Sequence, residues 1–254
     1  MIKKKLTQAH LLRYAPNNTG AGLEASIIDV AQDFLLTSLY KQGVFDYIAI
    51  KGGTSIRKFY AGNSGRFSTD LDFALSRSDI SINDAQDLLK SATEQASNDY
   101  FRYKVESRRG RPEIVYESDF GGVDILTTKI DVGAPSWLRP QERPWIQLPI
   151  HDTYGFELPT IKCVDLEENM SEKLARLNRR ALARDMYDLL WIATNSPYSQ
   201  FNKNFVRKLT VLKVWVDEYG VESQNQQWGK TIGAAAFNQN KWRTPFSPES
   251  IFDE

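Results

Sequence analysis

Between residues 47 and 73, a short apolar run, two adjacent glycines and a pair of aspartates follow one another along the chain. Residues 47–50 have the composition of a buried strand, Gly52 and Gly53 interrupt it, and a short helix is predicted to follow. Residues 71–75 are predicted to form a second strand. A strand that leads through glycines into a helix lets backbone N–H groups approach a phosphate closely, and the start of the helix adds partial positive charge. The sequence therefore predicts an anion-binding turn next to a strand that carries carboxylates.

The two aspartates lie at alternate positions, so in a strand Asp70 and Asp72 point to the same face. Two adjacent carboxylates repel each other and raise at least one pKa unless a cation lies between them. Mg²⁺ suits carboxylates, water and phosphate oxygens, and Mn²⁺ is an alternative. Asp131 lies at the end of another predicted strand, 123–132. If that strand lies beside residues 71–75, three carboxylates converge and a two-metal site becomes possible.

The glycine turn differs from two common phosphate-binding fingerprints, because both GxxxxGK[ST] and GxGxxG are absent here. The combination of Gly-Gly, Asp-x-Asp and a third Asp is instead what a nucleotidyltransferase of the polymerase-β type requires. In such an enzyme the glycines hold the triphosphate. The aspartates hold the metal that activates the attacking hydroxyl and stabilises the leaving pyrophosphate.

The rest of the chain divides into a mixed α/β part and an all-helical part. Residues 1–20 are expected to be a polar lead-in, and the proline-rich residues 133–148 an irregular crossing segment. Helices are predicted over 22–42, 82–97, 166–179, 182–194, 201–219 and 223–236. Further strands are predicted over 101–106, 113–117 and 123–132. We expect one α/β domain over residues 1–160 and a helical domain over residues 161–254.

Charge and cysteine content exclude several classes of protein. The chain has 254 residues with 32 Lys+Arg and 32 Asp+Glu, so its formal net charge of zero excludes a generally basic nucleic-acid-binding surface. No run approaches the roughly eighteen apolar residues of a membrane span, and the N-terminus lacks the apolar core of a signal peptide. Cys163 is the single cysteine, which excludes an internal disulfide and suits a small core residue. These features predict a cytoplasmic protein with no membrane segment.

Two blocks of this sequence resemble the AbiEii/AbiGii family of nucleotidyltransferase-like toxins, which includes the AbiE abortive-infection toxins and the mycobacterial MenT toxins. The first block is KGGTSIRKFY…RFSTDLDF, and the second is SEKLAR at 171–176 followed by RDMYDL at 184–189. Together they extend from residue 50 to residue 190. The resemblance implies an α+β fold, with a polymerase-β-type nucleotidyltransferase core of mixed sheet and flanking helices followed by a C-terminal helical bundle.

The resemblance also implies roles for individual residues. The family's Ser-x-Asp-x-Asp segment carries the metal site, which maps onto Ser68, Asp70 and Asp72, with Asp131 as a further expected metal ligand. The later Lys and Asp of the family map onto Lys173 and Asp185, which join Asp70 and Asp72 as expected catalytic residues. The residues expected to bind the nucleotide are Gly52, Gly53, Thr54, Arg57 and Ser68.

Plainer interpretations of the second block stay open at this stage. Asp188 lies three residues after Asp185 on the same helix, and either carboxylate could be the functional acid. Arg184 and Asp188 have the i, i+4 spacing of an ordinary surface ion pair, which contributes little to stability.

By resemblance, the chain is a cytoplasmic toxin that transfers NMP from an NTP, with Mg²⁺, onto an RNA acceptor. The expected acceptor is the tRNA 3′ end, and the expected partner is an antitoxin encoded alongside. Three alternatives remain: a same-fold enzyme that modifies a protein or small-molecule hydroxyl, a kinase-like toxin that transfers the γ-phosphate, and an idle binding protein. RNA binding by a neutral chain requires segregated charge, with basic groups at residues 176–184 and at the hairpin tip 108–111.

Overall fold

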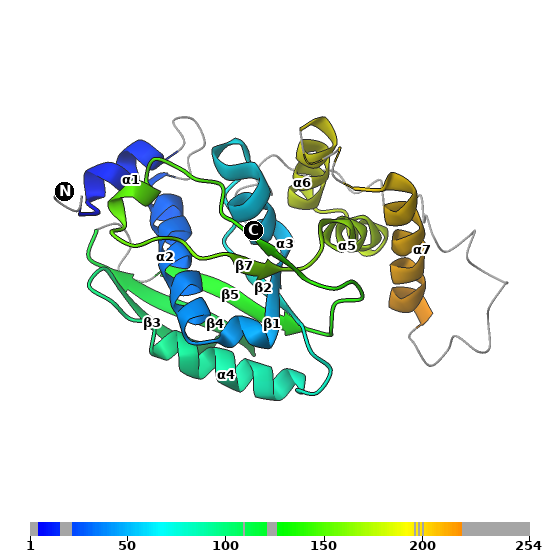
Figure 1. The fold of residues 1–254 in the computed structure, drawn as a ribbon, viewed down its shortest axis with the longest axis horizontal. Helices are drawn as coiled ribbons and strands as arrows, with labels where there is room; N and C mark the ends of the chain where they lie inside the picture. Colours follow the sequence, from blue (N-terminus) through cyan, green and yellow to red (C-terminus); the bar gives the residue numbers. More distant parts are fainter. Residues whose placement is uncertain are drawn as a thin grey trace. The chain divides into compact units, whose positions relative to one another are not determined.

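The computed structural model describes residues 5–15, 22–108, 110–120, 126–195, 197, 199 and 201–219. The chain divides into two compact units, Met1–Val164 and Asp165–Glu254, called here the first and the second unit. The helices α1 to α7 and the strands β1 to β5 and β7 are labelled in Figure 1. The helix predicted over 223–236 lies outside the described residues.

The first unit is a mixed sheet with helices. Its helical segments are α1 (Gln8–Tyr14), α2 (Gly22–Lys41), η1 (Val44–Asp46), α3 (Gly52–Ile56), η2 (Arg57–Ala61), η3 (Gly62–Ser64), α4 (Ile82–Glu94) and η4 (His151–Thr153). Its strands are β1 (Ile48–Lys51), β2 (Leu71–Leu75), β3 (Phe101–Arg108), β4 (Arg111–Ser118), β5 (Leu126–Gly133), β6 (Gln141–Arg143) and β7 (Ile161–Cys163). The short segment η2 is a single π-helical turn that continues α3.

The strands form one seven-stranded sheet in the order β3-β4-β5-β2-β1-β7-β6 (Figure 1). β2 pairs in parallel with β5, and β1 pairs in parallel with β7, whereas the other neighbours are antiparallel. Parallel neighbours cannot be joined by a tight turn, so a long crossover must connect them. Between β2 and β5 the chain forms α4 and the hairpin β3–β4. This crossover places β5 beside β2, as the interpretation of the Asp131 strand required.

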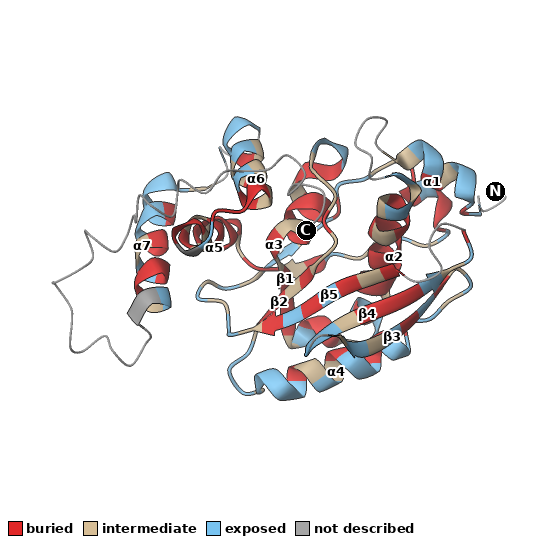
Figure 2. Ribbon diagram, turned by 180° about the vertical axis from the view of Figure 1, so that it is seen from behind, coloured by how far each residue is buried: buried red, intermediate tan, exposed pale blue. Residues whose placement is uncertain are grey.

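The two faces of the central strands differ in character because side chains alternate along each strand. On one face, Ile50, Phe73 and Val132 are buried in a large core together with residues of α2 and α4. Figure 2 shows this as buried residues along α2 and on the side of α4 that faces the sheet. On the other face, Ala49 and Ala74 form only a small cluster with Val164. The sheet is therefore covered by helices on one face and carries small residues on the other.

Three short elements were missed by the sequence interpretation. Residues 8–14 form α1 where a polar lead-in was expected, because Thr7 and His10 form a reciprocal capping box and Leu11 is fully buried. The strands β6 and β7 lie in stretches without strand alternation, and they pair with each other while β7 extends the sheet beside β1. The prediction of an irregular segment over 133–148 is therefore wrong at β6.

Cys163 lies in the core of the first unit, as expected, and is fully buried. Burial raises the pKa of its thiol to about 12. Since an ordinary cysteine has a pKa near 8.5, the folded protein holds about 10³-fold less thiolate at neutral pH. We expect a thiol reagent to label Cys163 about 10³-fold more slowly in buffer than in urea. A labelling rate in buffer within tenfold of the rate in urea would contradict this placement.

The second unit is helical in its described part, with α5 (Leu166–Arg179), α6 (Ala183–Thr194) and α7 (Lys203–Tyr219). The Asp165 side chain caps α5 by accepting a hydrogen bond from the backbone N–H of Glu167 at 2.8 Å. α5 packs against both α6 and α7. Among the helices of the described residues, none is both long and apolar enough to cross a membrane.

Candidate active site

The predicted glycine turn lies where β1 ends and α3 begins. Gly52 has φ of +76°, a conformation that side chains disfavour. A Cβ atom on Gly52 would lie only 2.7 Å from Oδ2 of Asp72, and one on Gly53 would lie 2.8 Å from Oγ of Ser68. Both glycines are thus required by close approach. The residues that the sequence singled out separately, Gly52 with Asp72 and Gly53 with Ser68, meet at one place.

The loop before β2 is held from two sides. Oγ1 of Thr54, which is fully buried, donates a hydrogen bond to the backbone carbonyl of Asp70 at 2.5 Å. Nε2 of Gln32, on α2, donates to the carbonyl of Thr69 at 3.1 Å. These bonds fix the backbone that carries Asp70 into the sheet. Thr54 was expected to bind nucleotide, and its contact in this structure is to the protein backbone.

The register of the sheet brings Asp131 beside Asp72. Asp72 lies directly opposite Asp131 in the parallel pair β2–β5, and opposite Lys51 in the antiparallel pair β1–β2. Neighbouring strands are about 4.8 Å apart, and residues in register point to the same face. Asp72 is half-buried and Asp131 is exposed. Asp72 and Asp131, called here the carboxylate row, lie on the face opposite the large core.

The carboxylates near the glycine turn are the side chains expected to bind Mg²⁺. Among the described residues, no group of three or more His, Cys, Asp or Glu side chains is gathered so that it could hold a metal ion. The expected convergence of Asp70, Asp72 and Asp131 is therefore not formed in this structure. Asp72 and Asp131 are direct register partners on the face that carries the glycine turn. Two carboxylates so placed suit a hard cation whose other ligands are water and phosphate. The residues that would hold it are Asp72 and Asp131, with Asp70 two positions before Asp72.

A second charged group lies within the second unit. Lys173, on α5, is only 2% exposed, and its Nζ lies 2.9 Å from Asp185 Oδ1 and 2.9 Å from Asp188 Oδ2. Asp188 is itself buried, which excludes the interpretation of that residue as part of a surface ion pair. Nη1 of Arg176 lies 3.6 Å from the second oxygen of Asp185. Both candidate acids on α6 therefore hold the same ammonium group.

Comparisons with known proteins bear on this combination. A family model described as "Nucleotidyl transferase AbiEii toxin, Type IV TA system" matches residues 33–244. The chain belongs to the AbiEii family of nucleotidyltransferase toxins. This AbiEii toxin is also similar to a solved structure of MenT4, a nucleotidyltransferase toxin from Mycobacterium tuberculosis. The two share 34% identity with a TM-score of 0.75, over 97% of this chain and 82% of that chain.

The other comparisons add little to the AbiEii assignment. An antigenic nucleotidyltransferase-like protein from Paracoccidioides brasiliensis matches with a TM-score of 0.42 and 12% identity, over 88% of this chain and 98% of that chain, which is too weak to carry an argument. No curated protein gives a significant match. The expected fold is confirmed by the family match and the MenT4 likeness, with a mixed sheet, flanking helices and further helices towards the C-terminus.

Arg57, which was expected to bind the nucleotide, is surrounded by protein groups in this AbiEii toxin. Arg57 is buried, and its guanidinium donates to the carbonyls of Gly62 and Gly65 and to Oδ2 of Asp29. It also lies over the ring of Phe67, 4.5 Å from the centroid. Its contacts are thus with the loop that leads to β2. Arg57 therefore braces that loop, and its guanidinium is engaged by protein groups instead of lining the glycine turn.

Beside Arg57, two buried aspartates of α2 share one lysine. Nζ of Lys58 lies 2.6 Å from Asp29 Oδ1 and 2.6 Å from Asp33 Oδ1. Tyr154 donates a hydrogen bond to the second oxygen of Asp33 at 2.6 Å, and burial raises the pKa of this tyrosine, so it remains a donor. The contacts link α2, η2 and the segment after η4. Sequence analysis missed this group, because its members are far apart in the chain.

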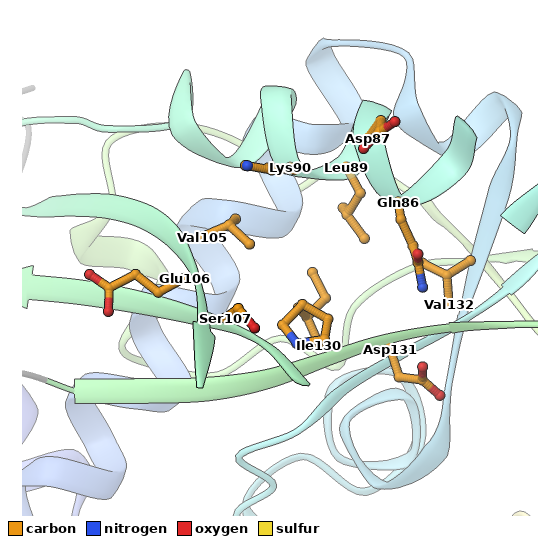
Figure 3. Close-up of a pocket in the computed structure, with 11 residues that line it drawn as sticks. Gln86, Asp87, Leu89, Lys90, Val105, Glu106, Ser107, Ile130, Asp131 and Val132 are labelled. Carbon is orange, nitrogen blue, oxygen red and sulfur yellow. The ribbon is translucent and has the colours of Figure 1, made fainter. Parts of the chain in front are cut away.

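A cavity of about 290 Å³ lies between α4 and the strands β3 to β5 (Figure 3). Its apolar lining includes Leu89, Ile130 and Val132, which point into the space between helix and strands in Figure 3. Asp131 belongs to the rim of the cavity, but its side chain points away from α4. The cavity therefore lies on the face of the sheet opposite the carboxylate row.

The hairpin tip of this AbiEii toxin does not form a purely basic patch. Arg108 lies 3.2 Å from Glu106, and Arg102, further along β3, lies 2.9 Å from Glu117 of β4. Arg109 lies outside the described residues. In the described part of the hairpin, Arg108 lies opposite Arg111 at the tip, and Glu106 lies opposite Glu113 two positions further from it. The basic residues of the tip are therefore followed directly by acidic residues.

The buried charges of the second unit lead to a stability prediction. Lys173→Met leaves Asp185 and Asp188 buried without their shared cation, so we expect the free energy of unfolding to fall by about 3–5 kcal/mol. Adding Asp185→Asn and Asp188→Asn removes the uncompensated charge and is expected to restore most of that loss. Urea unfolding followed by circular dichroism measures both variants. Lys208→Met, at an exposed position of α7, is the matched control, and a loss equal to that of the control would contradict the prediction.

Proposed function

We propose that this AbiEii toxin transfers a nucleoside monophosphate from an NTP to an RNA acceptor in the cytoplasm, and that the acceptor is the 3′ end of tRNA. The observation that carries the proposal is the direct pairing of Asp72 with Asp131 beside the Gly52–Gly53 turn. Two paired carboxylates next to a glycine turn, on the face of the sheet opposite the large core, are a donor set that suits the metal of a nucleotidyltransferase, and this supports the proposal.

Individual residues then take the following roles. Asp72 and Asp131 would hold Mg²⁺, or Mn²⁺, with Asp70 beside them. When bound, the ion would neutralise charge on the triphosphate, favour deprotonation of the attacking hydroxyl and stabilise the pyrophosphate that leaves as the bond between the α- and β-phosphates breaks. The Gly52–Gly53 turn and Ser68 line the approach to Asp72, since Gly52 packs against Asp72 and Gly53 packs against Ser68. Thr54 acts indirectly, by fixing the backbone of Asp70.

We propose that the Lys173 group serves the same reaction. Two carboxylates hold the Lys173 ammonium in a fixed position, which suits a point charge that binds phosphate. Asp185 and Asp188 are then positioning residues for Lys173. Asp185 and Asp188 both hold the Lys173 ammonium, so neither of them is singled out as the one functional acid.

The proposed acceptor is the one that the family resemblance implies, and it is compatible with the chemistry and with toxicity. Nucleotidyl transfer requires a nucleophilic hydroxyl, and the 3′ end of tRNA carries the hydroxyl that accepts the amino acid. Capping this hydroxyl with a nucleotide stops aminoacylation and therefore translation. A type IV toxin–antitoxin family also implies a cognate antitoxin, which we propose is encoded alongside.

Labelled nucleotides test the proposal. Wild-type protein is incubated with Mg²⁺, total tRNA and each NTP labelled at the α- or the γ-phosphate, and Asp70→Ala is run beside it. We expect α-label on tRNA only with the wild type, and we expect no γ-label. Label on the protein or on a small molecule would favour the same fold acting on another hydroxyl. γ-Label would favour a kinase-like reaction, and no label with any NTP would refute nucleotidyl transfer.

A further inference from the structure

Lys51 is the last residue of β1 and lies in line with the carboxylate row. It is the register partner of Asp72, which in turn is the partner of Asp131. The three residues therefore project from neighbouring strands β1, β2 and β5 on the same face. Lys51 is half-buried, so its side chain is accessible from solvent. In the sequence, Lys51 directly precedes the two glycines of the motif, and no function was expected for it from the sequence.

The side chain of Lys51 runs across β2 towards β5. Its Nζ lies 3.6 Å from the position that a Cβ atom of Gly133 would occupy, although Gly133 is on β5, two strands from β1. The residues on this face in the next register row are Ala49, Ala74 and Gly133. Because these residues are small, they leave room for the lysine stem to lie over the sheet. The ammonium thus ends close to the strand that carries Asp131.

This position suits a phosphate ligand. A cation held by the carboxylate row brings the triphosphate of a nucleotide to the same face. A lysine ammonium is a compact point charge with three donors, which matches phosphate oxygens. We propose that Lys51 is a further substrate-binding residue, whose ammonium contacts the β- or γ-phosphate of the bound NTP, which an NMP lacks. This inference rests on the proposed function, because it assumes that an NTP binds at the carboxylate row.

Calorimetric titration of the full chain with each NTP and Mg²⁺ tests the role of Lys51 without requiring transfer. We expect Lys51→Met to weaken NTP binding by about tenfold or more, as for a lost charge-assisted hydrogen bond. Lys51→Arg is expected to retain much of the affinity. The NMP is expected to lose less affinity than the NTP, which a merely structural lysine would not produce. Lys90→Met, at an exposed position of α4 on the opposite face, is the matched control and is expected to bind as the wild type does.

A change at Gly133 tests the path of the side chain. A Cβ atom there would be in ordinary contact with the ammonium, so Gly133→Ala is expected to bind NTP nearly as the wild type does. Gly133→Val adds bulk at the same place and is expected to weaken NTP binding in the same direction as Lys51→Met. Wild-type affinity in Gly133→Val would overturn the placement of the ammonium.

The outcomes separate this inference from the proposed function. If Lys51→Met binds NTP as tightly as the wild type, or more tightly, the phosphate contact is refuted even when tRNA labelling succeeds. An equal loss for NTP and NMP also refutes it. If the wild type labels no RNA but binds NTP in a Lys51-dependent manner, the acceptor proposal fails and the phosphate contact stands. Absence of NTP binding by the wild type refutes both.

Discussion

Asp72→Asn is expected to lower the rate of nucleotidyl transfer by about 10³-fold or more. Asp72 lies at the centre of the site, beside Asp131 in register and against Gly52. A catalytic metal contributes several kcal/mol of transition-state stabilisation, and about 1.4 kcal/mol corresponds to a tenfold change in rate. Asn has nearly the same shape as Asp, so the fold is expected to be retained. Initial rates of α-label incorporation into tRNA at saturating NTP measure the effect.

Asp79→Asn is the matched control for that experiment. Asp79 follows β2 in the chain, is exposed, and contacts Arg77 at the surface. The same loss of charge there is expected to leave the rate within about twofold of the wild type, because exposed ion pairs contribute little. An Asp72→Asn rate within tenfold of the wild type would mean that the carboxylate row does not hold the catalytic metal.

Lys58→Met is expected to produce the largest loss of stability in the first unit. It removes the cation that Asp29 and Asp33 share at 2.6 Å each, and both carboxylates are almost fully buried. Leaving a buried charge uncompensated costs about 3–5 kcal/mol. Urea unfolding at neutral pH measures the loss. Arg77→Met, which breaks an exposed pair, is expected to leave the midpoint unchanged, and a similar midpoint for Lys58→Met would contradict the prediction.

The effect of Lys58→Met on stability is also expected to depend on pH, because Lys58 contacts the buried carboxylate of Asp29. Burial alone would raise the pKa of Asp29, but the charges of Lys58 and Arg57 outweigh burial and lower it. A carboxyl whose pKa is lower in the folded than in the unfolded state contributes stability above the unfolded value, near 3.9, and loses it as pH falls through the folded value. We therefore expect wild-type stability to fall below about pH 4. The deficit of Lys58→Met is expected to be largest at neutral pH and to shrink as the Asp29 carboxyl becomes protonated.

Elements with a strong local signal could be predicted from the sequence. The helices expected over 22–42 and 166–179 are found as Gly22–Lys41 and Leu166–Arg179, because apolar residues at helical spacing define them. Gly43 ends α2 in the left-handed conformation that its position suggested. The candidate site could be predicted for the same reason, because two adjacent glycines and two aspartates at alternate positions form a short pattern that is recognisable in the sequence.

What could not be predicted depends on contacts between distant residues. β7 is a strand because it pairs with β1, and its three residues carry no pattern of their own. Arg57 stands where a phosphate-binding arginine would stand in the sequence, and only its partner Asp29, on another helix, shows that it braces the fold. The role of Lys51 depended equally on the register of three strands.

The parallel pairing of β2 with β5 determines when, during synthesis and folding, the candidate site can form. Its two carboxylates are joined by a pairing that must close over α4 and the hairpin β3–β4, and such non-local pairings form late in folding. A chain still on the ribosome that has not yet incorporated β5 contains the glycine turn and Asp72 but lacks Asp131. On the proposed function, a nascent chain lacks the pair of carboxylates until synthesis has passed residue 133, and it lacks the Lys173 group until later still. The nascent chain therefore cannot modify the tRNA used for its own synthesis while most of the first unit is being translated.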